Sequence, residues 1–290
     1  MKKRTALVYD FDGTLAPVYM QNGALLPKLG VKDPIAYWNQ NLALARGEDG
    51  DQVLIYLRRL IEIAREKGVA LTRELLNECG RGIAFFEGVE DWFDRIDAFA
   101  DSIGLELEHY VISAGNLEII EGCAIFPKFT KVYACKYHFD EKGDAVWPNV
   151  AINYTTKTQY LFRINKGVHD NWNQVAVNEW MPDEERPVPF SRMIYLGDGD
   201  TDIPSFKSVT TQDGYAIAVI DPAKWNDAQH RDTNHSLIAE ARVNFVVAAD
   251  YRETSALAVG VRGILDRIAR AERVHPKFFK NGAFRRPPAE

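Results

Sequence analysis

Residues 5–14 read TALVYDFDGT, and this stretch decides the fold. Its first part, residues 5–10, has the short, continuous apolar character of a central strand in a parallel sheet that is covered on both faces. Asp10 ends this predicted strand, and Asp12 follows in a turn that Gly13 permits. Open parallel sheets bind ligands just beyond the carboxyl ends of their strands. We therefore expect both carboxylates to lie at a binding site.

Two carboxylates this close together repel each other unless a cation separates them or one of them takes up a proton. Mg²⁺ suits such a place, because it binds carboxylate oxygens together with the oxygens of a substrate phosphate. A lone Asp-x-Asp is a weak signal, since acidic turns are common. An apolar strand that runs directly into Asp-x-Asp-Gly-Thr is a more specific indication of a metal and phosphate site.

A second acidic cluster follows another short apolar run. Residues 193–197 form a predicted strand, and GDGDTD occupies residues 197–202. Asp198 and Asp202 are four residues apart across a turn into a predicted helix, which allows both to point at one ion. An N-capping acidic loop is the alternative explanation of such a motif alone. Adjacent parallel strands bring their carboxyl ends to one edge of a sheet, so we expect the two acidic clusters to meet.

Candidate phosphate ligands follow two further elements. Ser113 ends a predicted strand over residues 105–113, and Ala114 lies at the predicted start of a helix, where a hydroxyl and free N–H groups form an anion site. Lys157 lies at the N-terminal end of another predicted helix, a place that disfavours a cation unless it has an anionic partner. Lys166 falls at the other end of that helix, where the dipole alone favours a cation, so we prefer Lys157. An N-capping serine and a solvated lysine are the alternatives.

The remaining sequence alternates between predicted strands and helices, apart from a helical insert after the first strand. This pattern predicts an α/β fold, a doubly wound parallel sheet with a Rossmann-like core and a small helical cap domain. We assign residues 1–16 and 87–290 to the core and residues 17–86 to the cap, whose three helices are expected to form a small bundle. Residues 168–190 form a predicted surface excursion without an assigned function, and the basic tail from residue 275 is expected to be mobile or loosely docked.

The composition excludes several classes of partner. The 290 residues carry a net charge of -6, which argues against the broad basic face that nucleic acid requires. No apolar stretch approaches the length of a membrane span. Cys79, Cys123 and Cys135 are far apart and form no CxxC pair, as is typical of a protein in a reducing cytoplasm. A soluble cytoplasmic protein that binds a small anionic molecule is expected, and its oligomeric state stays open.

Four of these segments together resemble a known family. VYDFDGT, VISAG, Lys157 within YTTKTQYL, and YLGDGDTD resemble, in this order, the four motifs of the haloacid dehalogenase-like (HAD-like) hydrolase superfamily. The first and fourth motifs match closely, and the resemblance extends from residue 5 to about residue 220. The helical insert between the first and second motifs resembles the cap of the phosphoserine-phosphatase-like branch.

The resemblance implies a set of catalytic and phosphate-binding residues. Asp10 would be the nucleophile, which attacks phosphorus and becomes an aspartyl-phosphate. Asp12 would protonate the leaving oxygen and later deprotonate the attacking water. Ser113, Ala114 and Lys157 would bind the phosphoryl oxygens and offset their charge.

The resemblance also implies a cofactor and its ligands. Mg²⁺ would be held by Asp10, the backbone carbonyl of Asp12, and Asp198, while Asp202 would order a metal-bound water or Lys157. The function expected is magnesium-dependent hydrolysis of a phosphate monoester of a small metabolite.

Two alternative functions are weighed against this one. Dehalogenases of the superfamily lack an acid at the position of Asp12, so its presence favours cleavage of a C–O–P linkage. A phosphomutase would share the first motif but usually has a smaller cap, and a non-catalytic phospholigand-binding module would be expected to lack Asp10 or Asp12. The cap also carries arginines that are candidates to meet a leaving group, with plain surface charge as their alternative role: Arg46, Arg58, Arg59 and Arg81.

Overall fold

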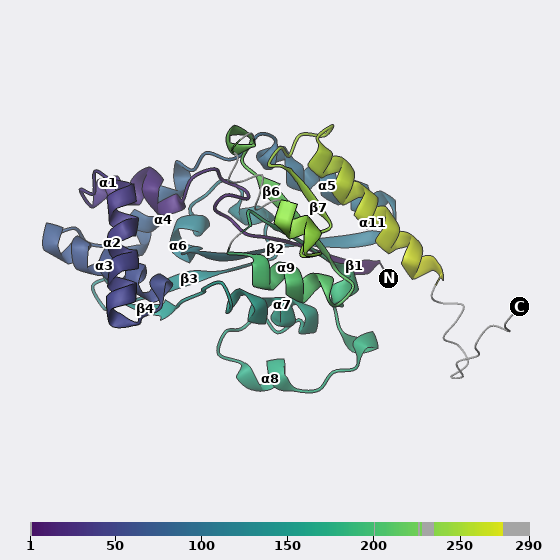
Figure 1. Cartoon of the computed structure of the whole chain (residues 1–290). Helices are drawn as coiled ribbons and strands as arrows, with labels where there is room; N and C mark the ends of the chain where they lie inside the picture. Colours follow the sequence, from purple (N-terminus) through teal and green to yellow (C-terminus); the bar gives the residue numbers. More distant parts are fainter. Residues whose placement is uncertain (1, 200, 226, 228–234, 275–290) are drawn as a thin grey trace, which may run out of the picture.

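A seven-stranded sheet forms the centre of the molecule (Figure 1), in the order β4-β3-β2-β1-β5-β6-β7. The computed structural model describes residues 2–199, 201–225, 227 and 235–274, so the predicted basic tail from residue 275 lies outside the described residues. The strands are β1 (Lys3–Tyr9), β2 (Leu105–Asn116), β3 (Lys131–Phe139), β4 (Ala145–Val150), β5 (Met193–Gly197), β6 (Tyr215–Ile220) and β7 (Phe245–Ala248).

β1 lies in the middle of the sheet, as its continuous apolar sequence predicts. Residues 6–9 are fully buried, and β1 pairs in parallel with β2 on one side and with β5 on the other. Because these neighbours come from distant parts of the chain, the winding of the sheet reverses at β1 and leaves a crevice beyond its carboxyl end. The predicted doubly wound α/β sheet is confirmed. Among the described strands only β4 is antiparallel, at one edge beside β3.

Helices cover both faces of the sheet (Figure 1). Two lie on each face: α5 (Val89–Ser102) and α11 (Ala256–Val274) on one, α7 (Lys157–Lys166) and α9 (Ile203–Thr210) on the other. Trp92 of α5 packs edge-on against Tyr251 with ring centroids 5.4 Å apart, and Tyr195 of β5 packs edge-on against Phe206 of α9 at 5.6 Å. Within the described part of the chain, every helix is too short or too polar to cross a bilayer.

The predicted helical insert follows β1. It contains a π-helical turn, η1 (Gln21–Leu25), and four helices: α1 (Leu26–Lys28), α2 (Pro34–Glu48), α3 (Gln52–Lys67) and α4 (Arg73–Arg81). Asp33 caps α2, because its side chain accepts a hydrogen bond from the Ala36 amide at 3.0 Å. The α3 helix stops at Gly68, whose φ of +66° is the left-handed conformation that favours glycine.

The α4 helix departs from the predicted three-helix bundle. It packs mainly against α6 (Leu117–Glu121) of the core, whereas α2 and α3 pack against each other. The approach to α6 is close, because a Cβ on Gly80 would overlap the carbonyl oxygen of Ile119, and a Cβ on Gly122 would overlap that of Asn77. Sequence periodicity shows which face of a helix is apolar and does not show which partner covers it.

Hydrogen bonds join the insert to the core. The Tyr56 hydroxyl of α3 donates to the carbonyl oxygen of Ala114 in β2. The Tyr137 hydroxyl of β3 donates to the carbonyl oxygen of Leu57 in α3 at 3.1 Å. Both links lie near the carboxyl ends of parallel strands, so the insert is held over the crevice.

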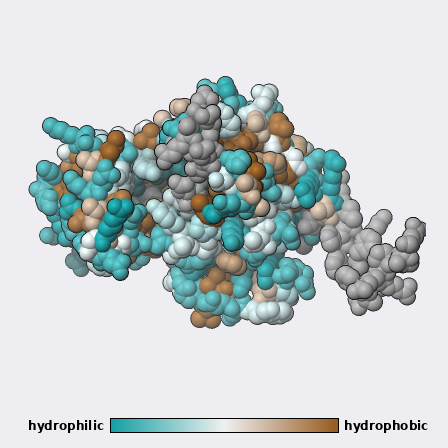
Figure 2. Space-filling model, in the orientation of Figure 1, coloured by the Kyte–Doolittle hydropathy of each residue, from teal (hydrophilic) through white to brown (hydrophobic). Residues whose placement is uncertain are grey.

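Residues 168–190 form the lobe around α8 (Gln174–Asn178) at the bottom of Figure 1. The end of α7 anchors this lobe, because Lys166 Nζ donates to the carbonyl oxygen of Val177 at 2.8 Å. Trp172, Val175 and Trp180 are 79%, 73% and 85% exposed. Figure 2 shows brown, hydrophobic residues on this part of the surface among hydrophilic ones. The predicted excursion is therefore an exposed lobe that contains a short helix.

We predict that Gly80→Ala lowers the free energy of unfolding by about 1–3 kcal/mol, because the added methyl group has to displace the backbone of α6. Gly82→Ala is the matched control, since a Cβ there meets no atom within 4 Å, and its effect should stay within about 1 kcal/mol. Urea denaturation of the two variants measures this difference. Equal stabilities would contradict the close packing of α4 on α6.

Candidate active site

Asp10 lies at the carboxyl end of β1, where it is 5% exposed. Its backbone N–H donates to the carbonyl oxygen of Leu196 at 2.9 Å, which fixes it against β5. Its Oδ1 accepts a hydrogen bond from the Phe11 amide at 2.7 Å, and its Oδ2 lies 2.9 Å from Lys157 Nζ. The carboxylate is therefore held in one orientation.

Lys157 is the cation at this site, and it has no exposed surface. From the first turn of α7, its Nζ reaches both Asp10 Oδ2 and Asp202 Oδ1, the latter at 2.8 Å. Burial opposes its charge, yet the two carboxylates outweigh burial and hold the pKa of Lys157 well above its usual value. Lys166 lies elsewhere, with its Nζ on backbone carbonyls of the 168–190 lobe. The structure thus places Lys157, and not Lys166, beside Asp10.

Both carboxylate oxygens of Asp202 are occupied by donors from the protein. Besides Lys157, Oδ1 accepts a hydrogen bond from the Tyr195 hydroxyl at 2.7 Å, and Oδ2 accepts one from the Asp198 amide at 3.1 Å. Gly197 is required here, because a Cβ at that position would overlap the Asp202 carboxylate. Asp202 is fully buried and holds its neighbours in place.

Asp198 approaches Asp10 from the loop after β5, so the two predicted acidic clusters do meet. One carboxylate oxygen each of Asp10, Asp198 and Asp202 lie within 4.8 Å of one another. Gly13, with a φ of +78°, allows the approach, because a Cβ there would overlap the Asp198 carboxylate. Such a set of hard oxygen donors fits a divalent cation such as Mg²⁺.

Asp12 lies two residues beyond Asp10 and is half-buried. Its Oδ1 accepts a hydrogen bond from the Met20 amide at 3.0 Å. Burial, followed by the negative charge of Asp10, raises the pKa of Asp12 well above its usual value. Burial also raises the pKa of Asp10 to about 6, against the opposing charge of Lys157. Both carboxyl groups therefore bind a proton more readily than an aspartate in water does.

Ser113 and Ala114 reach the site on β2, and here the predicted secondary structure is wrong. The strand continues to Asn116, so Ala114 lies in extended backbone and not at a helix start. Ser113 is 1% exposed, and its Oγ accepts a hydrogen bond from the Gly115 amide at 2.9 Å. The Ser113 hydroxyl therefore holds the end of β2 in place, and the expected helix N-terminus is absent from positions 113 and 114.

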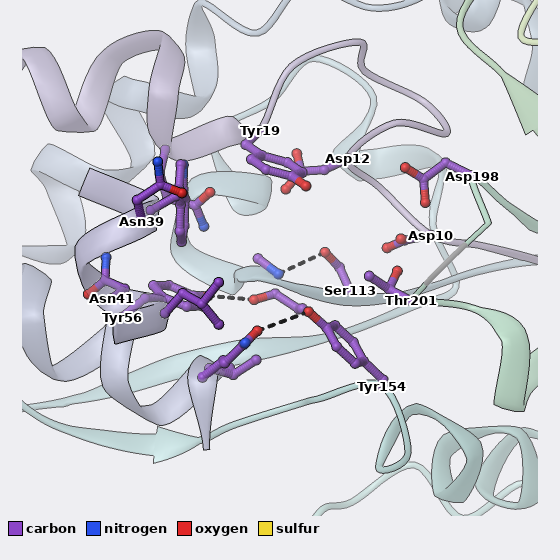
Figure 3. Close-up of a pocket in the computed structure, with 17 residues that line it drawn as sticks. Asp10, Asp12, Tyr19, Asn39, Asn41, Tyr56, Ser113, Tyr154, Asp198 and Thr201 are labelled. Atoms are coloured by element: carbon purple, nitrogen blue, oxygen red, sulfur yellow. Dashed lines mark hydrogen bonds between the residues drawn. The ribbon is translucent and has the colours of Figure 1, made fainter. Parts of the chain in front are cut away.

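A cavity of about 300 Å³ joins these groups to the insert (Figure 3). Asp10, Asp12 and Asp198 lie on one side of it, and Asn41 and Tyr56 lie on the other. Sequence reasoning missed the lining residues of the insert, because their spacing is that of an ordinary core or surface face: Tyr19, Gln21, Trp38, Asn39, Asn41, Leu42, Gln52, Val53 and Tyr56. Tyr154 and Thr201 also line the cavity, and they lie in turns within the third and fourth motif segments, where sequence reasoning assigned them no role.

The cap arginines do not meet the cavity. Arg58 forms an ion pair with Glu48 at 2.9 Å, and Arg59 forms one with Glu62 at 2.7 Å. Arg46 and Arg81 are exposed, and neither lines the cavity. The alternative role as surface charges is the one that the structure supports.

Solved structures with the same fold include HAD-family hydrolases and phosphoserine phosphatases. A HAD-family hydrolase of Salmonella enterica serovar Typhi gives a TM-score of 0.58 at 13% identity, over 91% of this chain and 72% of that one. A substrate-bound phosphoserine phosphatase gives 0.55 at 17% identity, over 87% and 97%. A phospho-aspartyl intermediate analogue of phosphoserine phosphatase gives 0.53 at 15% identity, over 90% and 99%. The predicted HAD-like, phosphoserine-phosphatase-like fold is confirmed.

Sequence comparison adds one relative. No family model matches the chain. An uncharacterized protein of Borreliella burgdorferi is 28% identical over 226 residues, which is 70% of this chain and 77% of that protein. The description of this relative names no activity.

We predict that Lys157→Met, in metal-free buffer, lowers the free energy of unfolding by roughly 3–5 kcal/mol, because two buried carboxylates lose their cation. Lys166→Met is the matched control at the other end of α7, and it should cost less than about 2 kcal/mol, since only hydrogen bonds to carbonyls are lost. Denaturant unfolding in EDTA measures both values. A loss in the control as large as that in Lys157→Met would contradict the central role of the ion pairs.

Proposed function

We propose that this protein is a magnesium-dependent phosphatase, which hydrolyses the phosphate monoester of a small metabolite through an aspartyl-phosphate on Asp10. One observation carries the proposal. A buried carboxylate, oriented by Lys157, shares a cavity with a second carboxyl group whose pKa is raised, Asp12. This pairing of a nucleophile with a proton donor is what transfer of a phosphoryl group from an alcohol requires.

In the first step, a carboxylate oxygen of Asp10 attacks phosphorus, and the bond between phosphorus and the alcohol oxygen breaks. Asp12 gives its proton to the departing oxygen, so that an alcohol leaves and an aspartyl-phosphate remains. In the second step, Asp12 accepts a proton from water as the water oxygen attacks phosphorus. Inorganic phosphate leaves, and the carboxylate of Asp10 is restored.

Lys157, Ser113 and Ala114 are the proposed phosphoryl ligands. The charge of Lys157 lies against Asp10 and offsets part of the negative charge that gathers there during transfer. Ser113 and Ala114 line the cavity from β2, whereas Lys157 contacts Asp10 without lining the cavity. These groups would hold the phosphoryl oxygens while phosphorus faces Asp10.

Mg²⁺ is the proposed cofactor, and the residues present fit it. Asp10, Asp198 and the backbone carbonyl of Asp12 would hold the ion, whereas both oxygens of Asp202 are already bound by protein donors, which suits a residue that orders the site. When bound, the ion reduces the repulsion between the anionic nucleophile and the anionic ester.

Domain organisation and location complete the proposal. Residues 17–86 would act as the cap that selects the substrate, and residues 1–16 and 87–290 as the catalytic core. The phospho-aspartyl analogue and the substrate complex of phosphoserine phosphatases are consistent with this chemistry on the same fold. The cysteines are free and buried, which suits a protein that works in the cytoplasm.

We predict that Asp10→Asn lowers phosphate release by at least about a thousandfold, because the amide is a poor nucleophile. Release of inorganic phosphate from a panel of phosphorylated metabolites, with Mg²⁺ and after EDTA treatment, measures this effect. The control is Asp94→Asn, whose exposed side chain pairs with Lys128 away from the site and should leave turnover unchanged. Turnover in EDTA, or full activity of Asp10→Asn, would refute the proposal. A phosphate ester isomerised without free phosphate would indicate a mutase.

We predict that Asp12→Asn lowers hydrolysis of an alkyl phosphate by about 10²–10⁴-fold, because an alkoxide needs a proton on leaving. With p-nitrophenyl phosphate, whose leaving group needs little protonation, the same variant should release a burst of about one nitrophenol per site and then slow, as the aspartyl-phosphate accumulates. Stopped-flow absorbance measures the burst. Equal losses on both substrates, without a burst, would contradict the assigned role of Asp12.

A further inference from the structure

The cavity is charged at one end only. Its aspartates, Asp10, Asp12 and Asp198, gather beside the strand ends. The residues that line the side of the insert are amides, aromatic rings and aliphatic side chains. Within the described part of the chain, no lysine, arginine, histidine or glutamate lines the cavity.

We infer that the substrate is the phosphate ester of a small, uncharged, polyhydroxylated alcohol, of the sugar or polyol class, and not of an amino acid. This inference rests on the proposed phosphatase function and defines its substrate class.

The lining excludes an amino-acid leaving group on electrostatic grounds. The carboxylate and ammonium groups of an amino acid lose part of their hydration on entering the cavity, so each needs an opposite charge within reach. Two arginines follow the lining residue Tyr56 in the sequence, but Arg58 pairs with Glu48 and Arg59 pairs with Glu62, and neither lines the cavity. A leaving group with a carboxylate would therefore meet no cation on the side of the insert.

Amide groups supply the recognition that hydroxyl groups need. Gln21, Asn39, Asn41 and Gln52 all line the cavity from the insert. An amide offers two donors and an acceptor, and a hydroxyl both donates and accepts, so the two kinds of group match. Gln21 is 2% exposed and is held by a 3.0 Å hydrogen bond from its Nε2 to Asn116 Oδ1. Asn41 is 4% exposed, and its Oδ1 has no partner among the described residues.

An aromatic cluster supplies a fixed apolar wall. Trp38 packs edge-on against Tyr19, Tyr37 and Tyr56, with ring centroids 5.7, 5.0 and 5.4 Å apart. Its Nε1 also donates to Asn22 Oδ1 at 2.9 Å. A ring held this firmly offers an apolar surface to the C–H face of a sugar at little cost in conformational entropy.

The size of the cavity limits the leaving group. About 300 Å³ lies at the lower end of the range of roughly 300–1,000 Å³ for small-molecule sites. The Tyr154 hydroxyl, from the core, donates to Gln52 Oε1 of α3 at 3.3 Å, which joins core and cap across the cavity (Figure 3). The space therefore suits a phosphorylated polyol or monosaccharide more than a nucleotide.

A substrate panel tests the inference. Values of kcat/KM with Mg²⁺ are compared for glycerol 3-phosphate, ribose 5-phosphate and glucose 6-phosphate against phosphoserine, phosphothreonine and adenosine monophosphate, with p-nitrophenyl phosphate as reference. The best polyol or sugar phosphate should exceed every amino-acid phosphate and the nucleotide by at least about tenfold. An amino-acid phosphate or the nucleotide as the best substrate would overturn the inference and leave the phosphatase function intact. No release from any compound, the aryl phosphate included, would refute the phosphatase function itself.

A paired substitution on α2 tests the role of the amides. Asn39→Ala removes an exposed lining amide, and the ratio of kcat/KM for the best sugar or polyol phosphate to that for p-nitrophenyl phosphate should fall by about three- to tenfold. Gln40→Ala is the control, because Gln40 is the next residue, is exposed and does not line the cavity. An unchanged ratio in Asn39→Ala, or an equal fall in Gln40→Ala, would count against recognition by this amide.

Discussion

The double ion pair of Lys157 is the interaction on which the rest of the site depends. A lysine without exposed surface is tolerated only when its charge is compensated, and Asp10 and Asp202 provide this at 2.9 and 2.8 Å. These three side chains come from the end of β1, the start of α7 and the loop between β5 and α9. Their pairing therefore holds three separate parts of the chain at one point beyond the sheet, as the reversal of winding at β1 allows.

The ion pairs of Lys157 also give the acidic groups different surroundings. Donors from Lys157, Tyr195 and the Asp198 backbone occupy the oxygens of Asp202. Asp10 keeps one face toward the cavity, and Asp12, with Met20 N–H as its hydrogen-bond donor, has a pKa shifted upward by burial. Carboxyl groups a few residues apart thus have different partners, Lys157 for Asp10 and the Met20 amide for Asp12, and such a difference in environment is what the proposed pairing of a nucleophile and an acid requires.

The acidic end of the cavity could be predicted from the sequence, because apolar strands that run into acidic turns are a local signal, and parallel pairing brings the ends of these strands together. The order of the four motifs and the place of Lys157 at the start of a predicted helix also identified the lysine that contacts Asp10. Long-range packing left no such signal. The strand through Ser113 continues where a helix was expected, and α4 packs on α6 through Gly80. The amides of α2 and the aromatic cluster around Trp38 have the spacing of ordinary amphipathic helices, so their place at the cavity emerged only from the fold.

The covalent step is the centre of this account, and it is open to direct measurement. The enzyme is quenched in acid during turnover of a phosphate ester and is then treated with borohydride, which reduces an aspartyl-phosphate to homoserine. After digestion, mass spectrometry assigns the homoserine to one position. The account predicts homoserine at position 10, dependent on substrate and on Mg²⁺. Turnover with an unmodified Asp10, or with the modification at another carboxylate, would contradict it.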